Sequence, residues 1–286
     1  MYNILVTGSD GQLGSELRFL SNKYKSYKYF FTDKDELDIC NINSLQKFVN
    51  NSKINVIVNC AAYTAVDKAE TEPELAHKIN FLGTKNLALI AKKNHCKLVH
   101  ISTDYVFDGT KISAYNEEDN PNPQSVYGKT KLLGEKTLKI INPENCIIIR
   151  TSWVYSKFGN NFVKTMLRLG LDREEINVVV DQVGSPTYAF DLAQMILQII
   201  PKIKNKKTTI FHYANDGFCS WADFATEIFK ISNINCKVNP ITTLDYPTPA
   251  KRPSFSVMNK SKIEEFFDLK IPRWKESLGR MLKFKQ

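Results

Sequence analysis

Residues 8–14 read Gly8-Ser9-Asp10-Gly11-Gln12-Leu13-Gly14 and follow directly on the apolar run Ile4-Leu5-Val6-Thr7. The apolar run predicts a buried strand, and the apolar spacing after it predicts a helix. Glycines in such a turn let the backbone approach a pyrophosphate closely, and the helix N-terminus offers that anion free N–H groups. A strand, a glycine-rich turn and a helix in this order indicate the start of a dinucleotide-binding unit.

The bulk composition is that of a globular protein. The 286 residues suffice for one large domain or two smaller ones, and 43% of them are hydrophobic and 24% charged. No apolar run reaches the roughly 20 residues of a membrane span. The first predicted strand also begins too early to leave room for a signal peptide. We therefore expect no membrane partner.

The cysteines and the charges predict neither a metal site nor a nucleic-acid partner. The six cysteines and four histidines form no CxxC pair and no metal-ligand spacing, so we expect reduced cysteines, a cytoplasmic location and no zinc. The formal net charge is +9, but no basic run alternates with aromatic residues. Spread along the chain, this charge suits the attraction of an anionic substrate and cofactor better than nucleic acid.

Strands and helices alternate in the first half of the chain. Strands are predicted at 4–7, 27–32, 56–60, 98–102 and 146–150, with helices at 13–22, 42–50, 74–94 and 126–141. Apolar strands separated by helices predict a parallel sheet that is covered on both faces. This α/β pattern predicts a Rossmann-type doubly wound sheet in residues 1–152.

The pattern changes after about residue 152. Helices are predicted at 161–169, 188–200, 221–231 and 274–284, with Ser220 as the N-cap of the third, and strands at 177–180 and 208–213. Three prolines predict an irregular loop at 245–253. We expect residues 153–286 to form a smaller C-terminal substrate-binding lobe, and we leave open whether the chain crosses back between the two parts.

A tyrosine and a lysine four residues apart supply candidate chemistry. Tyr127 and Lys131 fall on one face of the helix predicted at 126–141. An ammonium beside a phenol favours the phenolate, so we expect the pKa of Tyr127 to fall from about 10 toward the working pH. Such a tyrosine is a general acid that protonates an alkoxide. Behind a glycine-rich first turn, the pair predicts an oxidoreductase that uses a nicotinamide.

Further candidates follow the predicted strands, where open α/β sheets bind their ligands. Thr103, in preference to Ser102, would bind a substrate carbonyl, unless its hydroxyl only caps the strand. Asp33 follows the second strand and suits the adenosine ribose, whereas Lys34 suits a 2′-phosphate, so the choice between NADH and NADPH stays open. The small residues at 59–62 suit a dinucleotide backbone and close helix packing equally well.

Together these motifs resemble the extended short-chain dehydrogenase/reductases, and within them the dTDP-4-dehydrorhamnose reductase family. The matching stretches run through the whole chain in the family's order. They are Gly11-Gln12-Leu13-Gly14, 59–70 (NCAAYTAVDKAE), 102–109 (STDYVFDG), 127–131 (YGKTK), 150–155 (RTSWVY) and 246–253 (YPTPAKRP). The later stretches belong to the family's sugar-nucleotide lobe, which makes the resemblance more specific than membership of the superfamily.

The resemblance implies an activity and a set of site residues. The activity is reduction of the C4 ketone of dTDP-4-dehydro-β-L-rhamnose to dTDP-β-L-rhamnose with NADPH or NADH, the last step of dTDP-rhamnose biosynthesis. Catalytic roles are implied for Thr103, Tyr127 and Lys131. Contacts to the dTDP-deoxysugar are implied for Thr103, Asp104 and Trp153, whose indole suits either the apolar face of a 6-deoxysugar or the protein core. Cofactor contacts are implied for Gly8, Gly11, Gln12, Leu13, Asp33, Asp38, Ile39, Ala62, Tyr63, Thr64, Tyr127 and Lys131.

One position departs from the family pattern. Some members dimerise through Mg²⁺ held by two glutamates, one in the first helix and one in the substrate lobe. Glu16 matches the first, but the second falls on Phe190. A phenylalanine cannot ligate a cation that requires oxygen ligands. We therefore expect no Mg²⁺ site, and we leave the choice between monomer and homodimer open.

Two other functions share parts of this pattern. A nucleotide-sugar epimerase or dehydratase has the same fold, but the dehydratases place an Asp-Glu pair where this chain has Asp104-Tyr105. An epimerase makes no net use of reduced cofactor. A non-catalytic relative that resembles the regulatory β subunit of methionine adenosyltransferase binds a partner enzyme instead. The presence of Thr103, Tyr127 and Lys131 together weighs against that alternative.

Overall fold

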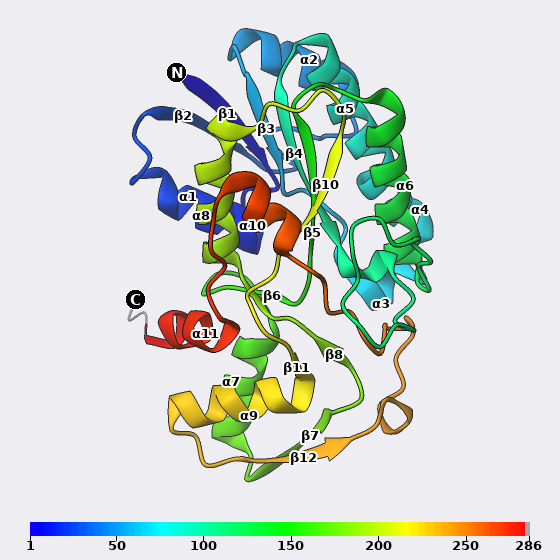
Figure 1. Cartoon of the computed structure of the whole chain (residues 1–286), viewed down its shortest axis with the longest axis vertical. Coiled ribbons are helices and arrows are strands. Elements are labelled where there is room, and N and C mark those ends of the chain that lie inside the picture. The colour runs from blue at the N-terminus through cyan, green and yellow to red at the C-terminus, as the bar shows by residue number, and fades with distance from the viewer. Residues whose placement is uncertain (284–286) are drawn as a thin grey trace.

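A six-stranded parallel sheet forms the centre of the protein in a computed structural model, which describes residues 1–283 (Figure 1). The strand order is β10-β5-β4-β3-β1-β2. The strands are β1 (Tyr2–Thr7), β2 (Tyr27–Thr32), β3 (Val56–Asn59), β4 (Lys97–Thr103), β5 (Cys146–Thr151) and β10 (Thr209–His212). This is the predicted α/β fold with a Rossmann-type doubly wound sheet. Residues 284–286, at the end of the expected second lobe and of the helix expected at 274–284, lie outside the described residues.

Helices cover both faces of the sheet, because parallel strands require crossover connections. On one face, α1 (Gln12–Ser21), α8 (Ala189–Ile199) and α10 (Ser261–Phe267) share an apolar core with Ile4 and Val6. On the other face, Leu5 packs among side chains of α2 (Ile42–Asn51), α5 (Thr84–Lys93) and α6 (Val126–Ile141). Successive side chains of β1 point to opposite faces, so its whole apolar run is buried.

The predicted strands of the first half are all present, with small differences at their ends. The helices predicted at 13–22, 42–50 and 126–141 are likewise confirmed. The prediction of one uninterrupted helix at 74–94 is wrong. This stretch contains α4 (Pro73–His77), a π-helical segment (Lys78–Gly83) and α5. The apolar pattern runs on through the π-helical segment, so periodicity alone does not reveal the change of hydrogen bonding.

A smaller lobe lies beyond the sheet, at the bottom of Figure 1. It contains three pairs of short strands and the helices α7 (Phe162–Asp172), α9 (Trp221–Ser232) and α11 (Trp274–Lys283), which share an aromatic-rich core. The predicted N-cap of α9 is confirmed, because Ser220 and Asp223 form a reciprocal capping box. The strand pairs are β6 (Val154–Tyr155) with β9 (Thr187–Tyr188), β7 (Glu175–Val179) with β12 (Lys237–Ile241), and β8 (Val183–Gly184) with β11 (Cys219–Ser220).

The chain crosses between the sheet and the lobe several times. After β5 it enters the lobe, and it then returns to the sheet as α8, which packs on α1, and as β10, which pairs with β5. Further along, the chain forms α10, which packs on the sheet, and α11, which packs in the lobe. Residues 246–253 are irregular, as their prolines predict. Among residues 1–283, no helix is both long and apolar enough to cross a membrane.

Candidate active site

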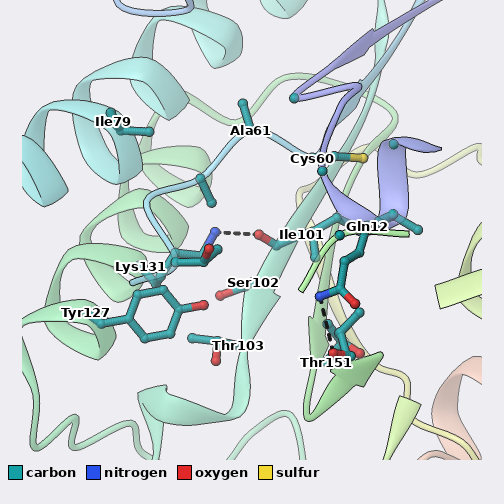
Figure 2. A pocket seen from close by; sticks show the side chains of 18 of the residues that line it. Gln12, Cys60, Ala61, Ile79, Ile101, Ser102, Thr103, Tyr127, Lys131 and Thr151 are labelled. Atoms are coloured by element: carbon teal, nitrogen blue, oxygen red, sulfur yellow. Dashed lines mark hydrogen bonds between the residues drawn. The ribbon is translucent and has the colours of Figure 1, made fainter. Parts of the chain in front are cut away.

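A cavity of about 810 Å³ opens where the parallel strands end and the lobe begins. Its walls come from the glycine-rich turn, from the segments that follow β2, β3, β4 and β5, and from α6. Figure 2 shows Tyr127, Lys131 and Thr103 on one side of this cavity and Gln12 across from them. Every site residue expected from the sequence lines the cavity except Tyr63.

The glycine-rich turn packs too closely against the rest of the fold to accept side chains. Gly8 has φ +64°, and a Cβ on it would lie 2.6 Å from the backbone of Ala61. A Cβ on Gly14 would lie 2.5 Å from the carbonyl oxygen of Gly8. Gly11 is the N-cap of α1 and offers no side chain to the amides of the first turn. These amides are therefore free for an anionic group bound in the cavity, which is the arrangement that a pyrophosphate requires.

The segments after β2 and β3 border the same end of the cavity. The carboxylate of Asp33 accepts hydrogen bonds from the backbone N–H groups of Asp10, at 3.1 Å, and Lys34, at 2.7 Å. The segment after β3 is held by Asn80 of the π-helical segment, whose side-chain amide bonds both the N–H and the carbonyl oxygen of Tyr63. The phenol of Tyr63 donates instead to Glu72 at 2.5 Å. This hydrogen bond raises the pKa of Tyr63 to about 12.

The three candidate catalytic residues come together from β4 and α6. Thr103 is the last residue of β4, and its Oγ1 accepts a hydrogen bond from the N–H of Tyr105, so it does cap the strand end. Tyr127 lies in the first turn of α6, and Lys131 follows one turn later on the same face. Figure 2 shows the Tyr127 hydroxyl pointing toward Thr103. The ammonium of Lys131 donates to the carbonyl oxygen of Ile101 at 2.6 Å.

The expected lowering of the Tyr127 pKa is wrong for the ligand-free protein. Burial raises the pKa of Tyr127 to about 12, with a further contribution from the nearby Asp104. Burial also lowers the pKa of Lys131 to about 8. Lys131 does not offset the effect of burial on the Tyr127 pKa, because its ammonium is directed to the Ile101 carbonyl rather than to the phenol. Tyr127 is therefore protonated at neutral pH and has a proton to donate.

A buried ion pair behind Lys131 escaped the sequence analysis. Glu135 accepts two hydrogen bonds from Arg150, at 3.0 and 2.8 Å, and one from Ser102, at 2.5 Å. Its negative charge favours the charged form of Lys131. Glu135 continues the four-residue spacing of Tyr127 and Lys131, and this signal was available in the sequence.

The substrate side of the cavity carries Asp104 and Trp153. Asp104 is 2% exposed, and its Oδ2 is buried without a hydrogen-bond partner. Burial raises the pKa of this carboxyl to about 6, although hydrogen bonds from Ser256 and Thr103 oppose the shift. Trp153 stacks on Trp221 with ring centroids 3.5 Å apart.

The position considered for Mg²⁺ holds the buried carboxylate of Glu16, and the charges of Lys157 and Asp191 act on its pKa. Glu16 accepts a hydrogen bond from Ser156 at 2.6 Å, and its second oxygen is buried without a partner. Phe190 lies against Phe19, with centroids 6.3 Å apart. Within residues 1–283, no three carboxylate, histidine or cysteine side chains gather as a metal site.

Comparisons with known proteins identify the family of this chain. The family profile described as "RmlD substrate binding domain" matches residues 2–286. The chain belongs to the RmlD substrate-binding domain family. A dTDP-4-dehydrorhamnose reductase of Aggregatibacter actinomycetemcomitans is 42% identical, covering 97% of each chain.

Solved structures of the RmlD family include close relatives of this chain. A dTDP-4-dehydrorhamnose reductase from Clostridium acetobutylicum has a TM-score of 0.93 and 48% identity, covering 98% of each chain. The enzyme of the same name from Bacillus anthracis, solved in complex with NADP, has a TM-score of 0.93 and 42% identity, covering 98% of this chain and 99% of its own. The resemblance to this family that the sequence motifs indicate is thereby confirmed.

Proposed function

We propose that this protein reduces the C4 ketone of dTDP-4-dehydro-β-L-rhamnose to a hydroxyl, with NADPH or NADH as reductant, and so forms dTDP-β-L-rhamnose. The observation that carries the proposal is the convergence of Thr103, Tyr127 and Lys131 on the cavity that also contains the glycine-rich turn. The relatives that are named dTDP-4-dehydrorhamnose reductases, at about the same length, support the choice of substrate.

The cavity has the features that a dinucleotide requires. The free amides of the first turn of α1 would hold the pyrophosphate, and Gly8, Gly11, Gln12 and Leu13 would lie against it. Asp33, Lys34, Asp38 and Ile39 line the cavity too, and we assign the adenosine to them. Ala62 and Thr64 line the same cavity. The NADP complex of the 42% identical relative supports NADPH as one cofactor.

The proposed chemistry needs one proton and one hydride. The nicotinamide, when bound, supplies the hydride to the ketone carbon. Tyr127, protonated at neutral pH, donates its phenolic proton to the ketone oxygen as negative charge develops there. Thr103 hydrogen-bonds the same oxygen and orients it.

Lys131 has two roles in this proposal. It holds the nicotinamide ribose, and its positive charge stabilises the phenolate that remains after proton transfer. The second role requires its ammonium to leave the Ile101 carbonyl and approach the phenol once ligands are bound. Glu135 keeps a negative charge nearby and favours the ammonium form of Lys131.

The partners and the location follow from the same proposal. We place the protein in the cytoplasm, as a monomer or a homodimer, with the dTDP-sugar as its partner and no role for nucleic acid. All six cysteines are free thiols, which is typical of proteins in a reducing compartment.

A direct assay tests the proposed function. The substrate would be generated in situ from dTDP-glucose by the upstream enzymes, and oxidation of NADPH and NADH would be followed by absorbance. We expect turnover that depends on every component, and product analysis by NMR would identify dTDP-rhamnose. A product formed without net oxidation of cofactor would indicate an epimerase and contradict the proposal. Absence of turnover, with dinucleotide binding intact, would contradict it as well.

A further inference from the structure

Trp153 has a backbone conformation that is rare for a bulky residue. Its φ is +47°, in the left-handed region. Such a conformation persists where the surroundings enforce it. Here the N–H of Thr187 donates to the Trp153 carbonyl oxygen at 3.1 Å, and the hydroxyl of the preceding Ser152 donates to the carbonyl of Ser185 at 2.7 Å. These bonds fasten the segment between β5 and β6 to β9 and to the segment that precedes it.

Both flat faces of the Trp153 indole are covered. On one face lies Trp221, with the centroids 3.5 Å apart and the planes at 7°. A Cβ built on Gly184 would lie 2.6, 2.8 and 2.9 Å from three adjoining ring atoms, Cε2, Nε1 and Cζ2. Such similar distances place Gly184 over the ring rather than beside it. A ring stacked at 3.5 Å leaves no room for Gly184 on the same side, so Gly184 covers the opposite face.

The two neighbours of the indole are held in register by one strand pair. In the antiparallel ladder of β8 and β11, Gly184 pairs with Cys219 and Val183 pairs with Ser220. Trp221 is the next residue, the first of α9, and the capping box of Ser220 fixes the start of that helix. The ladder therefore determines the distance between Trp221 and Gly184, and the indole of Trp153 lies between these two residues. In Figure 1, β8 and β11 lie beside the start of α9.

With both faces covered, the edge of the indole is the part of the ring that is left to border the cavity. Trp153 lines the cavity that contains Thr103 and Tyr127, whereas Trp221 and Gly184 are not among the residues that line it. A ring clamped on both faces cannot tilt away from a larger ligand, and a close-packed wall of this kind discriminates by size.

We propose that Trp221 and Gly184 determine specificity by positioning: they hold the edge of Trp153 as a fixed wall of the sugar compartment, which accepts a methyl group at C5 of a nucleotide sugar and disfavours a hydroxymethyl group there. The inference rests on the proposed function, because that function places a 6-deoxysugar between Tyr127 and Trp153. It assigns no contact with the ligand to Trp221 itself.

Circular dichroism tests the stacking of Trp153 on Trp221 without any ligand. Two indoles stacked this closely couple their transitions and give an exciton couplet in the far ultraviolet. We expect the couplet in the wild-type protein and in Trp274→Phe, which removes the tryptophan outside the pair. Trp153→Phe and Trp221→Leu should both abolish it. A couplet that persists in Trp153→Phe or in Trp221→Leu would overturn the inference, because these two indoles would then not be its source.

Calorimetry on the dinucleotide-bound protein tests the specificity, with dTDP-β-L-rhamnose, its 6-hydroxy counterpart dTDP-β-L-mannose, and dTDP as probes. In Trp221→Leu we expect the affinity ratio of dTDP-β-L-rhamnose to dTDP-β-L-mannose to shift toward dTDP-β-L-mannose by about tenfold, the effect of roughly one methylene of space. Binding of dTDP should stay unchanged, and Trp221→Phe should restore most of the wild-type ratio. Gly184→Ala should also alter the ratio, because its methyl group would displace the indole.

The outcomes separate this inference from the proposed function. An unchanged ratio in Trp221→Leu, or equal losses for all three probes, overturns the inference while leaving the reductase assignment intact. A wild-type protein that binds all three probes but shows no turnover contradicts the proposed function alone. A wild-type protein that binds neither dTDP-rhamnose nor dTDP contradicts both.

Discussion

Tyr127 is one of two neighbouring tyrosines that line the catalytic end of the cavity, with its ring centroid 5.5 Å from that of Tyr105. Burial raises the pKa of Tyr127 to about 12 and also raises that of Tyr105. Both phenols therefore carry a proton at neutral pH. What distinguishes Tyr127 is its position on α6, one turn before Lys131 and with its hydroxyl directed toward Thr103.

This difference leads to a paired kinetic test. Tyr127→Phe removes the proposed acid, and we expect kcat to fall by at least about 10²-fold, the lower end of general-acid contributions. Tyr105→Phe, the matched control, should retain kcat within a few-fold. Both variants should still bind NADPH, as measured by fluorescence titration. Near-normal turnover in Tyr127→Phe would contradict its assignment as the acid.

The buried carboxyl of Asp104 predicts how stability depends on pH. Burial raises its pKa from 3.8 to about 6 in the folded protein. The folded state therefore binds the proton more tightly than the unfolded state does. The stability from this group is fully present below pH 3.8 and is lost as the pH rises through about 6.

Asp104→Asn should remove this dependence. We expect the variant to be more stable than the wild type at pH 7.5 by up to about 3 kcal/mol, and the gain to shrink toward pH 4. Urea unfolding of both proteins across this range measures the difference. A gain in stability that does not vary with pH would contradict the raised pKa of Asp104.

Among the elements, the π-helical segment connects helix packing to the cofactor site. It places Asn80 in the interior, where the residue is 1% exposed. The side-chain amide of Asn80 forms hydrogen bonds with the backbone N–H and carbonyl oxygen of Tyr63 and with the hydroxyl of Thr130. The segment after β3 that these bonds hold lines the cavity through Ala61, Ala62 and Thr64. Asn80 therefore positions the dinucleotide site without lining it.

Replacement of Asn80 should affect both stability and cofactor binding. Asn80→Ala leaves buried backbone groups without partners, and we expect a loss of about 1–3 kcal/mol in the free energy of unfolding. NADPH affinity should fall as well, because the segment after β3 loses its support. Asn51→Ala, at the exposed end of α2, is the control and should change neither quantity. Unfolding and titration experiments on both variants decide this.

The fold could be predicted because its elements follow local rules. The all-apolar first strands and the glycine-rich turn specify a parallel sheet, and Ser220 with Asp223 specifies the start of α9. Thr103, Tyr127 and Lys131 were found because their spacing has a direct chemical meaning. Asn80, Trp221 and Gly184 were not, because each acts through a residue far away in the sequence, and only the tertiary structure brings the partners together.

On the scale of the whole molecule, many polar contacts join the lobe to the sheet side. One is the bidentate ion pair of Arg252 with Asp67, at 3.0 and 2.7 Å, which fastens the irregular stretch 246–253 to α3 (Val66–Ala69). Its hydrogen bonds hold the pKa of Asp67 below the usual 3.8. The stability that this pair contributes is therefore present above pH 3.8 and is lost as the pH falls through the lowered pKa.

Loss of the pair should loosen this stretch of the chain. In Asp67→Asn we expect trypsin to cleave after Lys251 faster than in the wild type, while the midpoint of global unfolding changes little, because a half-exposed ion pair contributes little to stability. Mass spectrometry of a digestion time course locates the cut. Equal cleavage rates would show that the ion pair does not hold the stretch in place.

The return of the chain to the sheet after β5 limits how relatives of this protein can exchange parts. A single recombination point at residue 152 would transfer the substrate lobe, but it would also import α8 against α1 and β10 against β5. The foreign helix and edge strand would have to fit a core that they had not been selected with. A new sugar preference is therefore more easily acquired by point substitutions around the cavity than by wholesale transfer of the C-terminal half.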